Sequence, residues 1–306
     1  MTDSSRRPGG IVCPVVTPLT SDGGLDEAVF RDLIEALVPD LDGLFVLGSS
    51  GELTMLSDET AMHTARVAVD QVAQRIPVYV GAGDTGLTRT LARAQRLADT
   101  GVDHLVVTPP FYYPVTDASR LVWYFETIAD RVAVPVVLYN IPQNTRVSLP
   151  PAAVRILAGH PNIVAIKDSA GDPFAFEEFL ALRSDGFSVL QGREQLAASS
   201  LWSGADGVIS AMGNIAPRLL RALVTSVRED RPRSETFALQ ATVSRLARVF
   251  DLGYWLSGLK ATLQELGREV GDPSPPLAAY DAAQRAAVHT IVTGADVAWL
   301  TRRGSR

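Results

Sequence analysis

Short apolar runs alternate with amphipathic segments along roughly the first 210 residues of the chain. Apolar runs of this length, bounded by glycine, proline and polar residues, are typical of buried strands. They predict strands at residues 11–16, 44–47, 78–80, 104–107, 136–138, 162–166, 188–190 and 207–210. Between these strands, apolar residues recur every three or four positions, which predicts amphipathic helices. These helices are expected near residues 26–38, 57–73, 87–100, 118–130, 150–159, 174–183 and 194–202.

The order of these elements indicates the fold class. Strands that are apolar along their whole length are covered on both faces, as in parallel sheets whose crossovers are helices. Eight strand–helix units in about 210 residues predict an α/β protein with a (β/α)₈ TIM barrel. A doubly wound open sheet is the alternative, but no glycine-rich dinucleotide fingerprint follows the first strand.

About 90 further residues follow the predicted barrel, which needs only one of the helices that they predict. These helices are expected near residues 216–227, 234–250, 254–267 and 276–293. We therefore divide the chain into an N-terminal tail (residues 1–10), the barrel (residues 11–228) and a C-terminal helical extension (residues 229–306). The extension is expected to serve as an interface or as a buttress of the barrel.

Lysine is rare in this chain, which has Lys167 and Lys260 against 26 arginines. Arginine keeps its charge in proteins, whereas a desolvated lysine can lose its proton and act as a nucleophile. Lys167 directly follows the apolar strand 162–166. Burying a long cationic side chain at such a position is costly, so its presence suggests a function. Its position indicates amine chemistry, above all a Schiff base with a carbonyl substrate; the alternative is a solvated lysine at a strand end.

Composition narrows the class of protein and its partners. The 306 residues are 46% hydrophobic and 20% charged, as in ordinary globular proteins. A net charge of −6 without a basic cluster argues against nucleic acids and acidic membranes as partners. Cys13, the single cysteine, rules out an internal disulfide framework, and the polar start lacks the pattern of a signal peptide, so we expect a cytoplasmic protein. No histidine lies in a metal-ligand spacing, so no metal is predicted. The histidines are His63, His104, His160 and His289.

The unusual polar residues follow the predicted strands, and in a TIM barrel the chemistry lies at those strand ends. Gly48-Ser49-Ser50-Gly51-Glu52 follows the second strand and Phe111-Tyr112 the fourth. Tyr139-Asn140 follows the fifth strand and Lys167 the sixth. Each segment alone has an ordinary interpretation, as a loop, rim aromatics or a solvated lysine. Together they place an amine, two phenols and two hydroxyls around one mouth, a set that suits imine formation, proton transfer and carboxylate binding.

These segments resemble the pyruvate-dependent class I aldolase family, which includes dihydrodipicolinate synthase, N-acetylneuraminate lyase and 2-keto-3-deoxygluconate aldolase. The resemblance covers nearly the whole chain, and its specific parts are residues 48–52, 139–140, 167–169 and 204–210. It implies a Schiff-base carbon–carbon lyase that acts on pyruvate or another small 2-oxo acid without a cofactor. It also implies a homo-oligomer, expected to be a tetramer built as a dimer of dimers.

The resemblance implies a role for each matching residue. Lys167 would attack the C2 carbonyl and form the imine, and Tyr139 would relay protons to it. Ser49 would link Tyr139 to Tyr112, a tyrosine that in the family usually reaches in from a neighbouring subunit. Ser50 would hold the pyruvate carboxylate together with the backbone N–H groups of Ser49 and Ser50, since such groups form an anion-binding nest.

One position departs from the synthase pattern. The synthase carries an arginine five residues after the tyrosine of its Tyr-Asn pair, where it binds the second substrate's carboxylate; here that place holds Asn144, and Arg146 lies two residues further on. A neutral amide suits a hydroxylated tail better than a carboxylate. We therefore expect cleavage of a 2-keto-3-deoxy sugar acid or similar 2-oxo acid to pyruvate and an aldehyde. The synthase, neuraminate lyase and a keto-deoxy acid dehydratase remain alternatives. The predicted substrate-binding residues are Ser50, Gly48, Asn144, Ile209 and Gly192.

Two functions of other classes also use a lysine or a keto acid. A pyridoxal-phosphate enzyme would need a phosphate site, for which the sequence has no convincing candidate. A non-catalytic keto-acid sensor would not need the complete set of lysine, tyrosines and serines.

Overall fold

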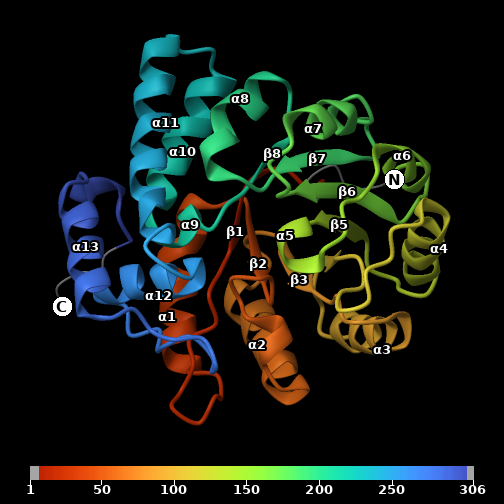
Figure 1. The fold of residues 1–306 in the computed structure, drawn as a ribbon, viewed down its shortest axis with the longest axis horizontal. Coiled ribbons are helices and arrows are strands. Elements are labelled where there is room, and N and C mark those ends of the chain that lie inside the picture. Colours follow the sequence, from red (N-terminus) through yellow and green to blue (C-terminus); the bar gives the residue numbers. More distant parts are fainter. Residues whose placement is uncertain (1–6, 302–306) are drawn as a thin grey trace.

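The computed structural model describes residues 7–301 and contains a closed barrel of eight parallel strands (Figure 1). The strands follow one another around the barrel in chain order, and β8 pairs with β1 to close it. They are β1 (Gly10–Pro14), β2 (Gly43–Val46), β3 (Val78–Gly81), β4 (His104–Val107), β5 (Val136–Asn140), β6 (Ile163–Asp168), β7 (Ser188–Gln191) and β8 (Gly207–Ile209). The predicted (β/α)₈ barrel is thus confirmed.

Helices surround the barrel, and further helices follow it in the chain. The outer helices are α1 (Glu27–Leu37), α2 (Asp58–Val72), α3 (Leu87–Ala98), α4 (Ala118–Ala129), α6 (Pro151–Leu157), α7 (Pro173–Leu180), α8 (Ala197–Trp202) and α10 (Pro217–Arg228). Two short helices, α5 (Pro142–Thr145) and α9 (Met212–Ile215), follow β5 and β8. The last helices are α11 (Arg233–Ala247), α12 (Trp255–Glu265) and α13 (Ala282–Thr293). Within residues 7–301, none of the helices has the length and apolarity needed to cross a bilayer.

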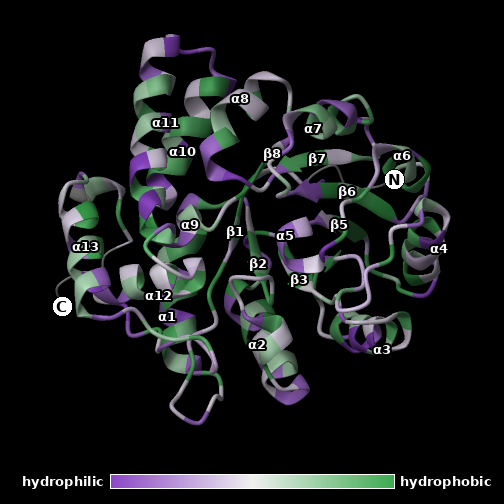
Figure 2. Ribbon diagram, viewed as in Figure 1, coloured by the Kyte–Doolittle hydropathy of each residue, from purple (hydrophilic) through white to green (hydrophobic). Residues whose placement is uncertain are grey.

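The sheet separates two apolar cores, because alternate residues of each strand face opposite sides. The larger core lies between the strands and the helices, and the strands are mostly hydrophobic in Figure 2. The smaller core fills the barrel interior with Val12, Phe45, Tyr79, Val106, Val137, Tyr139, Ile141, Ala165, Leu190 and Ile209. The end of this interior core that meets the mouth of the barrel is formed by Phe45, Val106, Tyr139, Ile141 and Ile209.

Local signals in the sequence set several element ends. Ser57 accepts a hydrogen bond from the Thr60 N–H and caps α2, as its position before the helix predicts. The predicted helix 276–293 is shorter in the structure, since Asp281 and Gln284 form a capping box that starts α13 at Ala282. Strands β5 and β6 are longer than predicted and include Asn140 and Asp168 at their ends.

The predicted tail differs from the structure at its end. Residues 1–6 of that tail lie outside the described residues, whereas Gly10 already belongs to β1. The division of the remaining chain at residue 229 stays a prediction.

The C-terminal segment packs on one side of the barrel, where α11, α12 and α13 gather beside α1 and α10 (Figure 1). Gln240 of α11 accepts from the Ala198 N–H and donates to the Glu194 carbonyl. Arg268 lies 2.6 Å from a carboxylate oxygen of Asp32 on α1. These contacts fit a buttress, one of the two roles expected for this segment.

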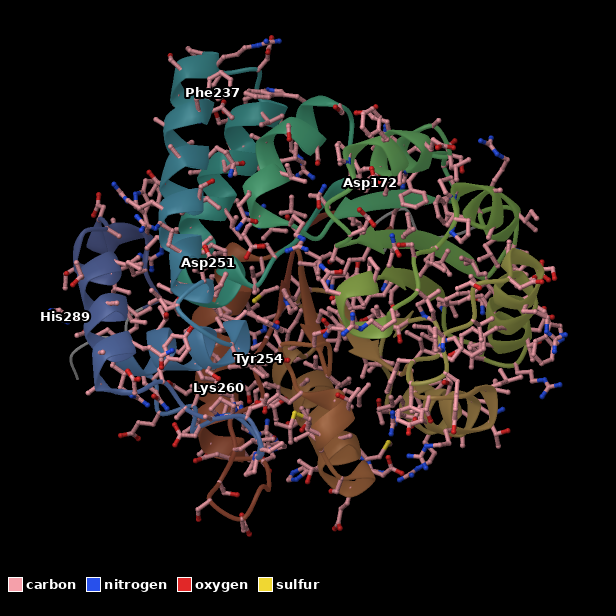
Figure 3. The ribbon with its side chains drawn as sticks, viewed as in Figure 1. Asp172, Phe237, Asp251, Tyr254, Lys260 and His289 are labelled. Carbon is pink, nitrogen blue, oxygen red and sulfur yellow. The ribbon has the colours of Figure 1, made fainter. Side chains whose placement is uncertain are left out.

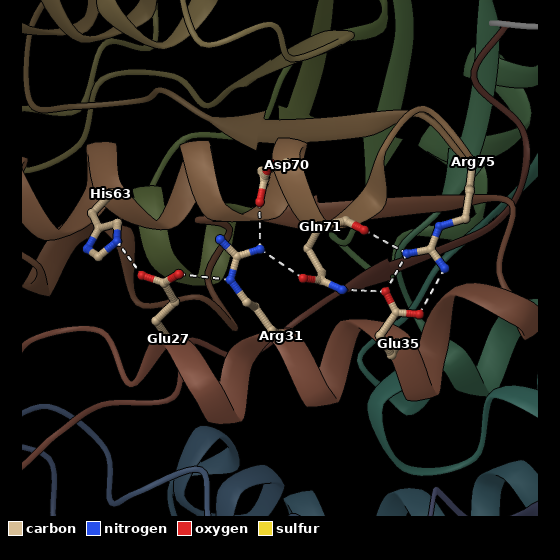
Figure 4. A network of polar contacts seen from close by, with 7 residues as sticks. All are labelled: Glu27, Arg31, Glu35, His63, Asp70, Gln71 and Arg75. Atoms are coloured by element: carbon tan, nitrogen blue, oxygen red, sulfur yellow. Dashed lines mark hydrogen bonds and ion pairs between the residues drawn. The ribbon is translucent and has the colours of Figure 1, made fainter.

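A surface network joins α1 to α2 on the outside of the barrel (Figure 4). Arg31 of α1 pairs with Glu27 one turn earlier and with Asp70 of α2, and His63 of α2 also contacts Glu27. Arg75, just after α2, pairs with Glu35 of α1. Such exposed pairs contribute about 0–1 kcal/mol each, so the network fixes the register of the two helices more than it stabilises the fold.

Candidate active site

A cavity of about 650 Å³ opens at the C-terminal ends of the strands. It brings together eight of the nine site residues predicted from the sequence. These are Lys167, Tyr139, Ser49, Ser50, Gly48, Asn144, Ile209 and Gly192. Because they lie at the C-terminal ends of β5, β6 and β8 or in the loops after β2, β5 and β7, the closed barrel brings them together.

Lys167 and Tyr139 lie next to each other on the cavity wall. They are register partners on the neighbouring strands β6 and β5, and both are at most 5% exposed. The Nζ atom of Lys167 lies 3.9 Å from the centre of the Tyr139 ring and 5.1 Å from that of Phe45. Two aromatic faces therefore hold a buried amine beside a phenol through cation–π contacts.

The end of β6 is fixed by hydrogen bonds next to the lysine. Asn140 donates its side-chain amide to Asp168 at 2.6 Å and accepts from the Leu149 N–H at 3.0 Å. Asp168 also accepts from the Ala170 N–H. Burial raises the pKa of the Asp168 carboxyl to about 6, against the lowering effect of these donors. Among the described residues that line the cavity, Asp168 is absent. Its carboxyl therefore fixes the end of β6 and does not face the cavity.

Gly192 lets the loop after β7 approach the end of β6. Its N–H donates to the Asp168 carbonyl at 2.7 Å. A Cβ atom at this position would lie 2.1 Å from the Ser169 hydroxyl oxygen, so only glycine fits. The close approach of the two segments therefore requires a glycine at this position of the cavity wall.

The loop after β2 presents unused backbone donors to the cavity. The Gly51 and Glu52 N–H groups turn back to the carbonyls of Gly48 and Ser49, and the Thr17 hydroxyl holds the Gly51 carbonyl. Within residues 7–301, the N–H groups of Ser49 and Ser50 make no hydrogen bond. Consecutive free N–H groups in a turn can bind an anion.

Leu47 and Glu52, on either side of this loop, adopt left-handed backbone conformations, with φ of 56° and 59°. Such conformations cost non-glycine residues about 1–3 kcal/mol, so surrounding contacts must hold the loop in place.

Tyr112 is the ninth predicted residue, and it is not part of the cavity lining of this single chain. It is 78% exposed with a left-handed φ of 78°, whereas its neighbour Phe111 does line the cavity. Arg146, considered as a substitute for the missing arginine, has a left-handed φ of 61°, is exposed and is absent from the lining. Asn144 lies on the lining as predicted.

Several lining residues were not anticipated from the sequence. Gln143 and Arg193 both donate to the Ser169 carbonyl, at 2.6 and 2.9 Å. Glu194 is buried against the cavity, and this burial raises the pKa of its carboxyl. Asp251 and Tyr254 extend the wall from the segment between α11 and α12, where Figure 3 labels them. Loop residues of common types after a strand, or far along the chain, carry no pattern that would place them here.

Charges on the cavity wall are mixed. The basic side chains on the wall are Lys167 and Arg193, and the acidic ones are Glu52, Glu194 and Asp251. The Arg193 Nε donates a hydrogen bond to the Ser169 carbonyl, whereas the terminal nitrogens of Arg193 make no hydrogen bond within residues 7–301. Among the described residues, no three His, Cys, Asp or Glu side chains are arranged to hold a metal ion.

Comparisons with known proteins show the family of the chain. Residues 7–295 match the model of the dihydrodipicolinate synthetase family. The 4-hydroxy-tetrahydrodipicolinate synthase of Xanthomonas axonopodis pv. citri (strain 306) is 39% identical over 288 residues, covering 92% of this chain and 94% of that protein.

A second relative carries a different name. YagE of Escherichia coli (strain K12), provisionally named a 2-dehydro-3-deoxy-D-gluconate aldolase, is 36% identical over 294 residues, covering 92% of this chain and 95% of that protein. The crystal structure of YagE in complex with pyruvate superposes with a TM-score of 0.88 at 32% identity, covering 94% of this chain and 98% of that one.

Together, the closed barrel, the buried lysine at its mouth and these matches over nearly the whole described chain identify the family. Its members are pyruvate-dependent class I aldolases and lyases. The chain is a member of the dihydrodipicolinate synthetase family, and it is a carbon–carbon lyase.

Proposed function

We propose that the protein is a Schiff-base aldolase that reversibly cleaves a 2-keto-3-deoxy sugar acid, or a similar hydroxylated 2-oxo acid, to pyruvate and an aldehyde. The observation that carries this proposal is the buried Lys167 amine, 3.9 Å from the Tyr139 ring centre at the base of the cavity. A lysine in this position supplies a nucleophile, and the adjacent phenol supplies a group that can move protons.

The proposed reaction begins when the neutral Lys167 amine attacks the C2 carbonyl of the substrate. Loss of water gives a protonated imine, which withdraws electrons from C3. The C4 hydroxyl then gives up its proton through Tyr139 as the C3–C4 bond breaks, releasing the aldehyde and leaving an enamine on the lysine. Protonation at C3 and addition of water to the imine release pyruvate and restore the amine.

The loop after β2 is proposed to bind the carboxylate at C1. The free N–H groups of Ser49 and Ser50 and the Ser50 hydroxyl supply donors, and Ser50 is only 3% exposed. Ile209 and Gly48 line the same cavity and complete the proposed substrate-binding surface. YagE, the relative of similar fold, has been crystallised with pyruvate, which supports a 2-oxo acid as ligand.

The substrate tail is assigned from Asn144, which offers an uncharged amide at the place where the synthase carries an arginine. The exposed side chains of Gln143 and Asn144, with Glu194 and Asp251 on the same wall, suit hydroxyl groups of a sugar acid.

The synthase reaction is the second candidate function. Arg193 favours it, because its free terminal nitrogens offer a cation to a second carboxylate. The synthase of Xanthomonas axonopodis also favours it by its 39% identity.

The assembly and location are proposed as well. We propose a cytoplasmic homotetramer, a dimer of dimers, in which Tyr112 of one chain completes the cavity of another. The high exposure of Tyr112 and its left-handed backbone support a role outside its own cavity.

The experiment that tests the proposed function is a screen of 2-keto-3-deoxy acids with pyruvate release as the readout. Aldol cleavage of at least one hydroxylated 2-keto acid is the expected result. Efficient condensation of pyruvate with an aspartate-semialdehyde-type partner, without any cleavage activity, would instead favour the synthase.

A further inference from the structure

The second lysine of the chain forms a buried ion pair with the loop that follows β2. The Nζ atom of Lys260, on α12, lies 2.6 Å from a carboxylate oxygen of Glu52. The two side chains are 1% and 0% exposed. Figure 3 labels Lys260 on α12, six residues after Tyr254, which lines the cavity wall.

Further hydrogen bonds complete the surroundings of this pair. The second Glu52 oxygen accepts from the Ser274 N–H at 2.7 Å, and Lys260 donates to the Asp272 carbonyl at 3.0 Å. A compact ammonium suits such a closed site better than the broad, planar guanidinium of arginine. This accounts for a lysine at position 260 in a chain that otherwise relies on arginine.

Glu52 also belongs to the cavity. It lines the cavity wall and stands two residues after Ser50, in the loop with the free N–H groups. An ionised Glu52 without a partner would place a negative charge beside a site that we assign to a carboxylate. Like charges that lie close together repel more strongly in a buried site than in water.

We propose that Lys260 neutralises Glu52 so that the loop after β2 presents no net negative charge to the carboxylate of the substrate. This inference rests on the proposed function, because it assumes that this loop binds a 2-oxo acid. Lys260 and Glu52 are then positioning residues: they touch the loop rather than the reacting atoms. The C-terminal segment thereby controls affinity for the anion and does more than support the barrel.

Asp272 is a further charged residue that acts on Lys260. Asp272 is exposed, and its carboxylate lies 3.7 Å from Arg285. Burial lowers the pKa of Lys260, opposed by Glu52 and Asp272. The variants below leave the other ionisable groups of the cavity unchanged. Each variant is compared with the wild type at the same pH, so that these groups contribute equally to both. They are Lys167, Tyr139, Arg193, Glu194, Asp251 and Tyr254.

The test measures the ligand concentration that gives half-maximal trapping of the imine by borohydride, with pyruvate and with its neutral methyl ester. Lys260→Met should raise this concentration about tenfold or more for pyruvate at pH 8 but change it little for methyl pyruvate. Glu52→Gln should not weaken pyruvate binding, and the double variant Glu52→Gln/Lys260→Met should bind it within about threefold of the wild type.

A control variant separates the effect of the charge near the cavity from the effect of a weakened contact between the C-terminal segment and the barrel. Arg268→Met removes another ion pair between the C-terminal segment and the barrel, with Asp32, but Arg268 does not line the cavity. It should leave the ratio of pyruvate to methyl pyruvate unchanged. If Lys260→Met does not fold, the inference is tested by pyruvate binding in Glu52→Gln and in the double variant.

Two results would overturn the inference. One is equal weakening of the binding of pyruvate and of methyl pyruvate in every variant that breaks the pair. This result would mean that the ion pair only stabilises the structure. The other is unchanged pyruvate binding in a folded Lys260→Met protein. Failure of the proposed function looks different, because the wild type itself would then form no adduct with pyruvate.

Discussion

Lys167 and Tyr139 are register partners across β5 and β6, and the lysine Nζ lies 3.9 Å from the centre of the tyrosine ring. Neighbouring parallel strands fix this pairing through their backbone hydrogen bonds, so neither side chain depends on a mobile loop for its position. Reactive groups on rigid elements are held more precisely than groups on loops. The nucleophile and its proton-relay partner are thus properties of the barrel, whereas the substrate specificity lies in the surrounding loops.

Replacing the relay phenol should stop catalysis without unfolding the protein. Tyr139→Phe keeps the ring over the Lys167 amine but removes the hydroxyl, so turnover should fall on the order of 10²-fold or more. Steady-state kinetics and circular dichroism test this pair of expectations. Tyr79→Phe is the matched control, since Tyr79 is equally buried inside the barrel but does not line the cavity. Turnover above half of the wild-type value in Tyr139→Phe would remove Tyr139 from the relay.

The identity of residue 144 should separate the two candidate reactions. Asn144→Arg places an unpaired cation where a hydroxylated tail is expected, so cleavage of a neutral polyol substrate should slow severalfold. Wild-type protein should show weak or absent synthase activity when both reactions are compared at equal enzyme concentration. Ser148→Arg adds the same charge at an exposed position outside the cavity lining and should leave cleavage unchanged. Efficient synthase activity in the wild type would transfer the carboxylate-binding role to Arg193.

Stability should depend on pH through Asp168. Because burial raises the pKa of this carboxyl to about 6, the folded state holds a proton that the unfolded state releases near pH 4. The free energy of unfolding of the wild type should therefore fall, relative to Asp168→Asn, as the pH rises from 4 to 6, by about 2–3 kcal/mol in total. Urea titrations of both proteins at several pH values measure the difference. A difference that stays constant, or that grows in favour of the wild type, would contradict this account.

The role of Tyr112 is testable by mixing subunits. Tyr112→Phe and Lys167→Ala should each be nearly inactive alone. In hybrids, a cavity with Lys167 from one chain can receive Tyr112 from the other, so activity should recover in part after subunit exchange. Sedimentation analysis should show tetramers. Hybrids that stay inactive would mean that Tyr112 does not complete a neighbouring cavity.

The fold was largely predictable because the information is local and repeated. Each strand is a short apolar run, each crossover has helical periodicity, and eight such units leave few alternatives to a closed barrel. Residues at strand ends could be placed for the same reason, since identifying a strand also locates the residues at its C-terminal end. Lys167 and the Ser49–Ser50 turn therefore emerged from the sequence.

The rest of the site depends on contacts between distant segments. The sequence marks Glu52 only as the last residue of the segment after the second strand, because nothing in the chain links it to Lys260, more than 200 residues later. Arg193, Asp251 and Tyr254 reach the cavity through the packing of the loop after β7 and of the C-terminal helices, which apolar periodicity does not describe. The position of Tyr112 relative to the cavity depends on the assembly, about which a pattern along one chain carries no information.

The central claim is that Lys167 forms the covalent intermediate. Borohydride added together with pyruvate should raise the mass of the protein by one reduced pyruvate adduct per chain, and peptide mapping should locate it at Lys167. Lys260 is an internal control, because it is the other lysine of the chain and lies fully buried against Glu52. A single adduct at Lys167 is the predicted result. An adduct at Lys260, or no adduct at all, would contradict the Schiff-base mechanism.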